Sequence, residues 1–346
     1  MDLLSEENVK EHVLPEYNMA SADITRIKFK DTNKQRAVYK ISHLNKNYCL
    51  KKVYFDEGNL LFVYSAIEWL FRNNINVPRI LPTIHNERFV KYNNMFFILT
   101  PWIDGIKCDY DNSSHLFSTT LNLAKMHNRS KNFIPIEKSY KRTNFQNIYI
   151  SFEKHFRQLL NCSNLSFRYQ DKFSKLFLKN FEVNSTLAEI ALKVSSAINY
   201  DNLTTSLCHL DYVNKNIIFD NNSKVWVIDF DKCSIDYCSH DLSYFLRRFL
   251  KRTNSNWNLN TAIKCLTLYE KVSTLTLDDY KYIISYLSFP QKFWKISRDY
   301  YNNITKCNTS SFFYLLKKAS NNNINQLEFI VGLGKYTEKK FDTLIT

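Results

Sequence analysis

Glycine is scarce in this chain, with four glycines among 346 residues. Loops that grip phosphate with backbone N–H groups rely on glycine, because a Cβ atom keeps the backbone away from the ligand. None of the four glycines precedes Val38, and the stretch "ITRIKFKDTNKQR" contains none. The sequence therefore excludes a glycine-rich phosphate loop ahead of Val38.

Long apolar runs are also missing. No uninterrupted apolar run reaches the roughly 18 residues that a membrane-spanning helix needs. The first residues, "MDLLSEENVKEHVLPEYN", mix acids and bases where a secretory signal would have its apolar segment. We therefore expect neither a secretory signal nor a membrane span.

Cysteine pairs with metal-binding spacing are missing as well. The chain has eight cysteines, and none of them form a C-x-x-C pair or a zinc-ligand pattern. Scattered cysteines of this kind are typical of reduced thiols that fill the core of a cytosolic protein. They are Cys49, Cys108, Cys162, Cys208, Cys233, Cys238, Cys265 and Cys307.

Positive charge is abundant, with a formal net charge of +14. The basic clusters are short, as in "RRFLKR" at 247–252 and "KYTEKK" at 335–340, and aromatic residues do not alternate with them. Such clusters favour a solvated surface over a nucleic-acid site. A positive surface still attracts phosphates and anionic polymers. We expect no specific nucleic-acid partner.

Hydrophobic periodicity predicts strands early in the chain and helices later. The segment 36–55 reads as two strands joined by a turn, and 87–102 reads as a second hairpin. Helical spacing predicts helices over 57–74, 115–130, 146–160, 171–198 and 240–252, with several more between 257 and 330. We expect an α+β fold with a small β-rich lobe over 1–100, a hinge at 101–105 and a larger helical lobe over 106–346.

The stretch "SLCHLDYVNKNIIFDNNSKVWVIDFDKC" places charged residues at the ends of two apolar runs. His209 and Asp211 lie on a loop, and Asn216 follows Asp211 by five residues. A predicted hairpin over 217–231 then brings Asp229 back to the end from which Asn216 starts. Amide and carboxylate oxygens suit Mg²⁺ with bound phosphates, and Asp211 can orient or deprotonate a hydroxyl. The pattern predicts a metal and phosphate site, whereas a set of caps and turns is the plainer alternative.

This order of residues, followed by "HDLSYFL", resembles the aminoglycoside phosphotransferase and choline kinase branch of the protein-kinase-like fold. Within that branch the chain resembles CotS-type spore coat proteins of endospore-forming bacteria. The phrases that carry this resemblance are "VYKI", "YCLKKV", "LLFVYSAIEWL" and "LAKMH". The resemblance implies a bilobal kinase-like fold with a catalytic loop at 207–216 and a metal-site hairpin at 217–231.

In the catalytic loop and hairpin, the resemblance implies specific roles. Asp211 would be the catalytic aspartate, and His209 would brace the loop more than transfer a proton. Asn216 and Asp229 would hold Mg²⁺, with Asp231 near the metal or in a hydrogen bond. Elsewhere, Asp241 would tie the loop down, although an acid in the first turn of a helix needs no such role.

In the N-terminal lobe, the resemblance implies a nucleotide-gripping set. Lys51 of "YCLK" matches the phosphate-binding strand lysine, whereas Lys52 points to the other face and is expected in solvent. Glu68 would pair with Lys51, with Glu57 as a rival and a plain helix-surface acid as the alternative. Backbone groups near Thr100 and Trp102 would meet an adenine, or would serve only to pack the lobes.

Two departures from the family pattern concern the catalytic loop. Leu210 stands where small-molecule kinases often have glycine, and Val213 stands where a histidine or lysine commonly helps. The resemblance implies an ATP- or GTP-dependent phosphotransferase that uses Mg²⁺ on a hydroxyl of a small molecule, sugar or coat component. The alternative is a catalytically inactive scaffold of the spore coat. Either protein would work in the mother-cell cytoplasm and then in the coat, with other coat proteins as partners.

Overall fold

The computed structural model describes residues 2–30 and 36–345, which form two compact units. The first unit comprises 1–143 and 206–235, and the second comprises 144–205 and 236–346. The predicted lobe boundary at 101–105 lies inside the first unit and stays a prediction. Two of the boundaries between the units fall inside strands: one after Thr205 in β7 (Thr205–Cys208) and one after Ile235 in β10 (Ser234–Tyr237).

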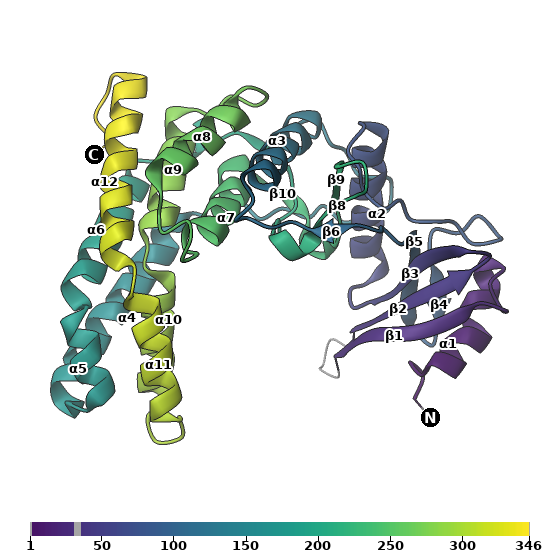
Figure 1. Ribbon diagram of the computed structural model, residues 1–346, viewed down its shortest axis with the longest axis horizontal. Helices are drawn as coiled ribbons and strands as arrows, with labels where there is room; N and C mark the ends of the chain where they lie inside the picture. The colour runs from purple at the N-terminus through teal and green to yellow at the C-terminus, as the bar shows by residue number, and fades with distance from the viewer. Residues whose placement is uncertain (1, 31–35, 346) are drawn as a thin grey trace. The chain divides into compact units, whose positions relative to one another are not determined.

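A five-stranded antiparallel sheet organises the start of the first unit, in the order β1-β2-β3-β5-β4 (Figure 1). The two predicted hairpins are confirmed as β2–β3 and β4–β5. No strand is predicted ahead of residue 36, whereas the structure has the edge strand β1 there. The strands are β1 (Asp23–Lys30), β2 (Arg36–His43), β3 (Lys46–Val53), β4 (Val90–Tyr92) and β5 (Met95–Pro101).

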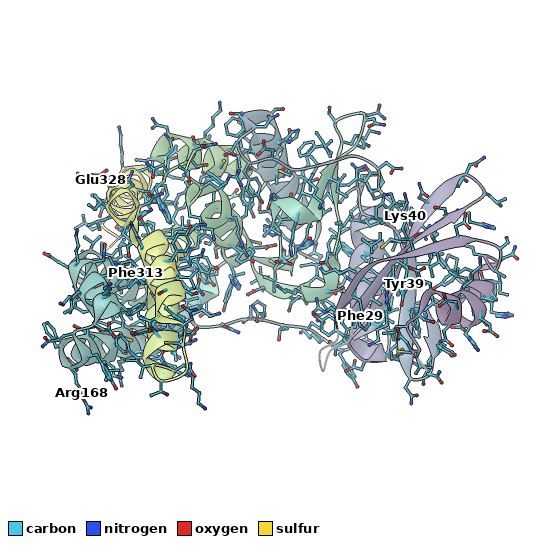
Figure 2. All side chains as sticks on the ribbon, turned by 60° about the horizontal axis from the view of Figure 1, so that its bottom comes forward. Phe29, Tyr39, Lys40, Arg168, Phe313 and Glu328 are labelled. Atoms are coloured by element: carbon cyan, nitrogen blue, oxygen red, sulfur yellow. The ribbon has the colours of Figure 1, made fainter. Side chains whose placement is uncertain are left out.

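One face of this sheet is covered by the N-terminal helix α1 (Glu6–His12) and the short helix at Leu14–Tyr17. Val9 and Leu14 pack with Tyr39 of β2 in a single buried cluster. Neighbouring side chains of a strand point to opposite faces, so Tyr39 is buried while Lys40 lies on the other face (Figure 2).

Two helices and a small sheet complete the first unit. Helix α2 (Glu57–Arg72) and helix α3 (Ser113–Arg129) confirm the helices predicted there, and each begins at an Asp or Asn cap. A three-stranded sheet holds the predicted hairpin, although β9 ends at Val227 rather than at Asp229. Its strands are β6 (Ile106–Lys107), β8 (Ile217–Phe219) and β9 (Val225–Val227).

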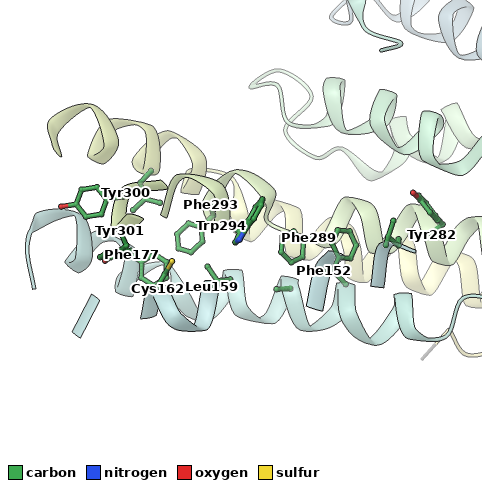
Figure 3. Packing of buried hydrophobic residues seen from close by; sticks show 14 of the residues in the cluster. Phe152, Leu159, Cys162, Phe177, Tyr282, Phe289, Phe293, Trp294, Tyr300 and Tyr301 are labelled. Atoms are coloured by element: carbon green, nitrogen blue, oxygen red, sulfur yellow. The ribbon is translucent and has the colours of Figure 1, made fainter. Parts of the chain in front are cut away.

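The second unit is helical, as predicted for most of the chain after 105. Aromatic side chains fill its core, where Phe152 stacks on Phe289 and Phe177 stacks on Phe293 (Figure 3). Its helices are α4 (Ile148–Tyr169), α5 (Lys172–Lys179), α6 (Phe181–Ser196), α7 (Cys238–Leu250), α8 (Leu259–Glu270), α9 (Leu277–Ser288), α10 (Gln291–Asn302), α11 (Thr309–Ser320) and α12 (Asn323–Phe341).

The cysteines are all free thiols, and six of the eight are buried, as the sequence indicated. Among the described residues, no helix has both the length and the hydropathy required to cross a bilayer.

Candidate functional site

Lys51 occupies the centre of the predicted site. It lies on β3, on the face opposite Leu50, and its ammonium nitrogen Nζ lies 2.7 Å from Asp229 Oδ1 and 2.6 Å from Asp231 Oδ1. Burial would lower the pKa of Lys51, but the charges of the two carboxylates outweigh it and raise the pKa. The structure thus joins a strand of the large sheet to the Asp-rich hairpin through a cation held by two anions.

Asp229 follows β9 in an unusual backbone conformation, with a φ of 69°. A residue with a Cβ adopts this left-handed region only at a cost in free energy. Such residues cluster at functional sites, where the surrounding structure holds them in place. Burial would raise the pKa of Asp229, but the charge and hydrogen bond of Lys51 lower it to about 2. Asp229 is therefore an anion at neutral pH.

Asp231 is the more buried carboxylate of the pair, with a side chain that is 7% exposed. Its backbone carbonyl accepts a hydrogen bond of 2.7 Å from Arg142. Its second side-chain oxygen, Oδ2, is buried and has no hydrogen-bond partner among the described residues. A buried carboxylate oxygen without a donor is costly unless a cation or ligand meets it.

His209 is fully buried and braces the loop through both ring nitrogens. The backbone N–H of Asp211 donates to Nδ1 over 3.2 Å, so Nδ1 must be an unprotonated acceptor. Nε2 then carries the proton and donates to the carbonyl of Ile228 over 3.0 Å. This neutral imidazole links the loop to the residue before Asp229. The geometry therefore favours the bracing role over the catalytic one.

Asp211 lies in a basic and amide-rich setting. Its Oδ2 accepts a hydrogen bond of 3.2 Å from Asn216 Nδ2, and the same nitrogen donates to its backbone carbonyl over 3.0 Å. Two lysines that the sequence reasoning did not single out face this carboxylate. Lys232 Nζ lies 3.5 Å from Oδ1, and Lys215 Nζ lies 3.7 Å from Oδ2. Lys215 is next to Asn216 in the sequence and Lys232 is next to Asp231, so both could have been predicted to lie near the site.

The donor set fits a hard divalent cation. Asn216 is buried, and its amide nitrogen is committed to Asp211, which leaves its oxygen as the group able to bind a metal. The backbone N–H of Ile228 donates to the Asn216 carbonyl over 2.9 Å and so couples this residue to the chain leading to Asp229. With the partnerless oxygen of Asp231, these ligands have the chemistry that Mg²⁺ prefers.

Glu68 pairs with Arg79 rather than with Lys51, and it is not an exposed helix-surface acid either, because only 6% of the residue is exposed. Its carboxylate is bound by Arg79 through two hydrogen bonds, of 2.7 Å to Oε1 and 3.0 Å to Oε2. A two-pronged arginine contact satisfies a buried carboxylate fully. Glu57, the rival candidate, is exposed in the first turn of α2.

Thr100 and Trp102, the residues predicted to contact an adenine, already pair with other residues of the first unit. The backbone N–H of Trp102 donates to the Asn47 carbonyl over 3.0 Å, and Thr100 pairs with Cys49 in the β3–β5 ladder. The Trp102 N–H is therefore not available to a nucleotide in this structure. Lys40 lies 5.5 Å from the centre of the Trp102 ring, a cation–π distance.

Lys52 was expected in solvent, and this prediction is wrong. It does point away from Lys51, but the face it reaches is covered, and only 9% of the residue is exposed. Burial lowers its pKa. Strand alternation predicts the face but not what covers that face.

Two further sequence predictions, the role of Asp241 and the absence of a glycine-rich loop before Val38, stay predictions. Asp241 is fully buried in the first turn of α7, within the second unit, and its role in fixing the loop stays a prediction. Residues 31–35, between β1 and β2, lie outside the described residues, so the absence of a glycine-rich loop there rests on the sequence alone.

Leu210, at the centre of the His-x-Asp motif, adopts a left-handed conformation with a φ of 57°. This explains why glycine suits the position. We expect Leu210→Gly to have a free energy of unfolding about 1 kcal/mol higher than Leu210→Ala, because both variants lose the side chain but only alanine keeps the Cβ strain. Chemical denaturation of the two variants measures this difference.

The same pair of substitutions at Leu192 provides the control. Leu192 is half-buried inside the regular helix α6, where alanine is favoured over glycine by about 1 kcal/mol. The order of stability should therefore reverse between the two positions. An alanine variant at 210 more stable than the glycine variant would contradict the strain.

Comparisons with known proteins identify a family for most of the chain. Residues 23–333 match the family model described as "Spore coat putative kinase YutH". Spore coat protein S of Bacillus subtilis (strain 168) is 19% identical over 303 residues, which cover 86% of this chain and 85% of that protein.

Solved structures with a similar fold are phosphotransferases. An aminoglycoside phosphotransferase from Alicyclobacillus acidocaldarius subsp. acidocaldarius DSM 446 aligns with a TM-score of 0.77 and 18% identity, covering 94% of this chain and 96% of its own. Spectinomycin phosphotransferase APH(9)-Ia, in complex with ADP and spectinomycin, aligns with a TM-score of 0.63, 19% identity and the same coverage. These similarities confirm the predicted α+β kinase-like fold.

Proposed function

Because the chain belongs to the spore coat putative kinase YutH family, we propose that it is an ATP- and Mg²⁺-dependent phosphotransferase of the spore coat. The acceptor is a hydroxyl of a small molecule, a sugar or a coat component, and GTP is the alternative donor. The protein works in the mother-cell cytoplasm and then in the coat, among other coat proteins. The observation that carries the proposal is the convergence of Lys51, Asp229 and Asp231.

In this proposal the side chains divide between two tasks. Asp229, Asp231 and the Asn216 oxygen would hold Mg²⁺, which would neutralise part of the phosphate charge, and Lys51 would turn from the carboxylates to the nucleotide phosphates. Asp211 accepts the hydroxyl proton as the acceptor oxygen bonds to the γ-phosphorus and the bond to the β-phosphate oxygen breaks. His209 holds the loop that positions Asp211.

The test is calorimetric titration of Mg·ATP into the wild-type protein and into Asp229→Asn. We expect magnesium-dependent binding to the wild type and binding at least tenfold weaker to the variant, because the variant loses one anionic ligand of the metal. Asp201→Asn, an exposed position in the second unit, is the matched control and should bind as the wild type does.

The alternative function is a kinase-like scaffold of the coat without turnover. The scarcity of glycine and the engaged N–H of Trp102 favour it, since both remove contacts that a nucleotide would use. Absence of any Mg·ATP binding by the wild type up to millimolar concentration would refute the enzyme and favour the scaffold. Binding without phosphate transfer to any hydroxyl, water included, would also favour it.

A further inference from the structure

A cavity of about 330 Å³ lies within the first unit, between α3, the end of α2 and the β8–β9 hairpin. Helix α3 packs against β9 here, as the ribbon also shows (Figure 1). Ten residues line the cavity, and none of them is acidic. Its polar lining is made mostly of three cations and three amides: Lys125, Arg129, Lys224, Asn74, Asn76 and Asn122.

The guanidinium of Arg129 is held in place before any ligand arrives. Its Nη1 donates to the backbone carbonyls of Asn73 over 2.7 Å and Asn74 over 3.1 Å. These bonds fix the plane of the group and leave its other N–H groups for a ligand. A side chain ordered in advance loses little further entropy on binding.

One acid, Asp220, interacts with Lys224 and offsets part of the positive charge of the two lysines. Within residues 2–30 and 36–345, neither Lys125 nor Lys224 forms an ion pair, and Lys125 is half-buried. Asp220 is the acid whose charge Lys224 offsets. Its carboxylate already accepts hydrogen bonds from the Asn222 and Lys224 backbones and from the Trp226 indole. Among the described residues, the three cations of the cavity therefore leave an excess of positive charge, of which Asp220 offsets a part.

We propose that this cavity is a binding site for a small phosphorylated molecule, separate from the Lys51–Asp229–Asp231 cluster. Arginine and lysine together suit a phosphate group, the first by planar paired hydrogen bonds and the second as a point charge. The amides add neutral donors, and the volume falls within the range of small-molecule pockets. Three cations match a ligand that carries two to three negative charges.

The walls of the cavity also support both halves of the catalytic motif. Asn122 Nδ2 donates to the hydroxyl of Tyr212 over 3.2 Å, and Tyr212 directly follows Asp211. The Asn76 carbonyl accepts the N–H of Val227 over 3.0 Å, two residues before Asp229. A ligand that orders these walls stabilises the loop and the hairpin together, so the site can act as an effector site.

Inorganic pyrophosphate is the probe for the experiment. Calorimetric titration without magnesium is carried out on the wild type, on Lys125→Gln and on Lys224→Gln. We expect about tenfold weaker binding for each lysine removed, since a charge-assisted contact of this kind is worth about one power of ten or more. Lys91→Gln, an exposed position on β4, is the matched control and should bind as the wild type does.

Two further arms make the result decisive. Asp229→Asn, altered at the other site, should keep its pyrophosphate binding, which locates the probe in the cavity rather than beside Lys51. Citrate, a carboxylate anion of similar charge, should bind more weakly than pyrophosphate. Equal binding by the two lysine variants and the wild type, equal affinity for citrate, or no binding by the wild type at millimolar concentration would each overturn the proposal. Binding is the readout throughout, so the test does not depend on phosphotransferase activity.

Discussion

Replacing Asp211 by asparagine is expected to slow phosphoryl transfer by a factor of about 10² to 10⁴, the usual contribution of a positioned general base. Asparagine keeps the shape of the side chain but cannot accept the hydroxyl proton. Mg·ATP affinity should change little, because the metal and phosphate ligands proposed here are Lys51, Asn216, Asp229 and Asp231. Release of ADP, with water or a hydroxyl compound as acceptor, measures the rate.

A slower rate of phosphoryl transfer with an unchanged affinity for Mg·ATP would identify Asp211 as the base. Asp201→Asn should leave both quantities at their wild-type values, since this carboxylate is exposed in the second unit. A wild-type rate in Asp211→Asn would show that Asp211 does not act as the base. An equal loss of affinity and rate would instead place Asp211 among the metal ligands.

Replacing Lys51 by methionine is expected to lower the free energy of unfolding by about 2–4 kcal/mol. Removing one member of a buried charge cluster leaves the others uncompensated, and this costs about 3–5 kcal/mol when burial is complete. The Asp229 side chain is 35% exposed, so solvent screens part of that cost. Chemical denaturation at neutral pH measures the difference, with Lys46→Met at the exposed start of the same strand as the control.

The pH dependence of this loss has a definite sign. In the wild type the pKa of Asp229 is lowered to about 2 from an ordinary value of 3.8. This group therefore stabilises the fold above about pH 4, and its contribution disappears as the pH falls from about 4 to about 2. The gap between wild type and Lys51→Met should be full at pH 7 and should shrink in acid. A gap that does not depend on pH would mean that lost packing, not the ion pair, accounts for it.

The contacts within the loop around Asp211 could be predicted from the sequence because they are local. His209, Asp211 and Asn216 lie within eight residues, and one short hairpin returns the chain to Asp229. In the structure hydrogen bonds link His209, Asp211 and Asn216, and His209 also bonds to the carbonyl of Ile228, the residue before Asp229. Contacts between residues so close in sequence can be predicted without knowing the rest of the fold, because only a few turns of the chain connect them.

The partner of Glu68 could not be read in the same way. An acid on a helix that faces the sheet is equally compatible with Lys51 and with a nearby arginine. Arg79 was not considered because it follows the helix in an irregular segment, where the sequence gives no direction for a side chain. Ion pairs between elements depend on distances that only the assembled fold determines.

Strand β1 was missed for a physical reason as well. It is an edge strand, and its apolar residues Ile27 and Phe29 are 50% and 39% exposed. A strand with so little burial lacks the clear alternation that marks an interior strand. Charges at Arg26, Lys28 and Lys30 further obscured it.

The position of Lys51 has a consequence for ion selectivity. Lys51 is the counter-ion of both Asp229 and Asp231 in this structure, so under the proposed function a bare divalent cation would have to displace its ammonium group. Under the proposed function, a metal that arrives on a nucleotide would bring phosphates to receive that ammonium, and every charge would keep a partner. The proposed function therefore implies that the resting site favours magnesium together with nucleotide over magnesium alone.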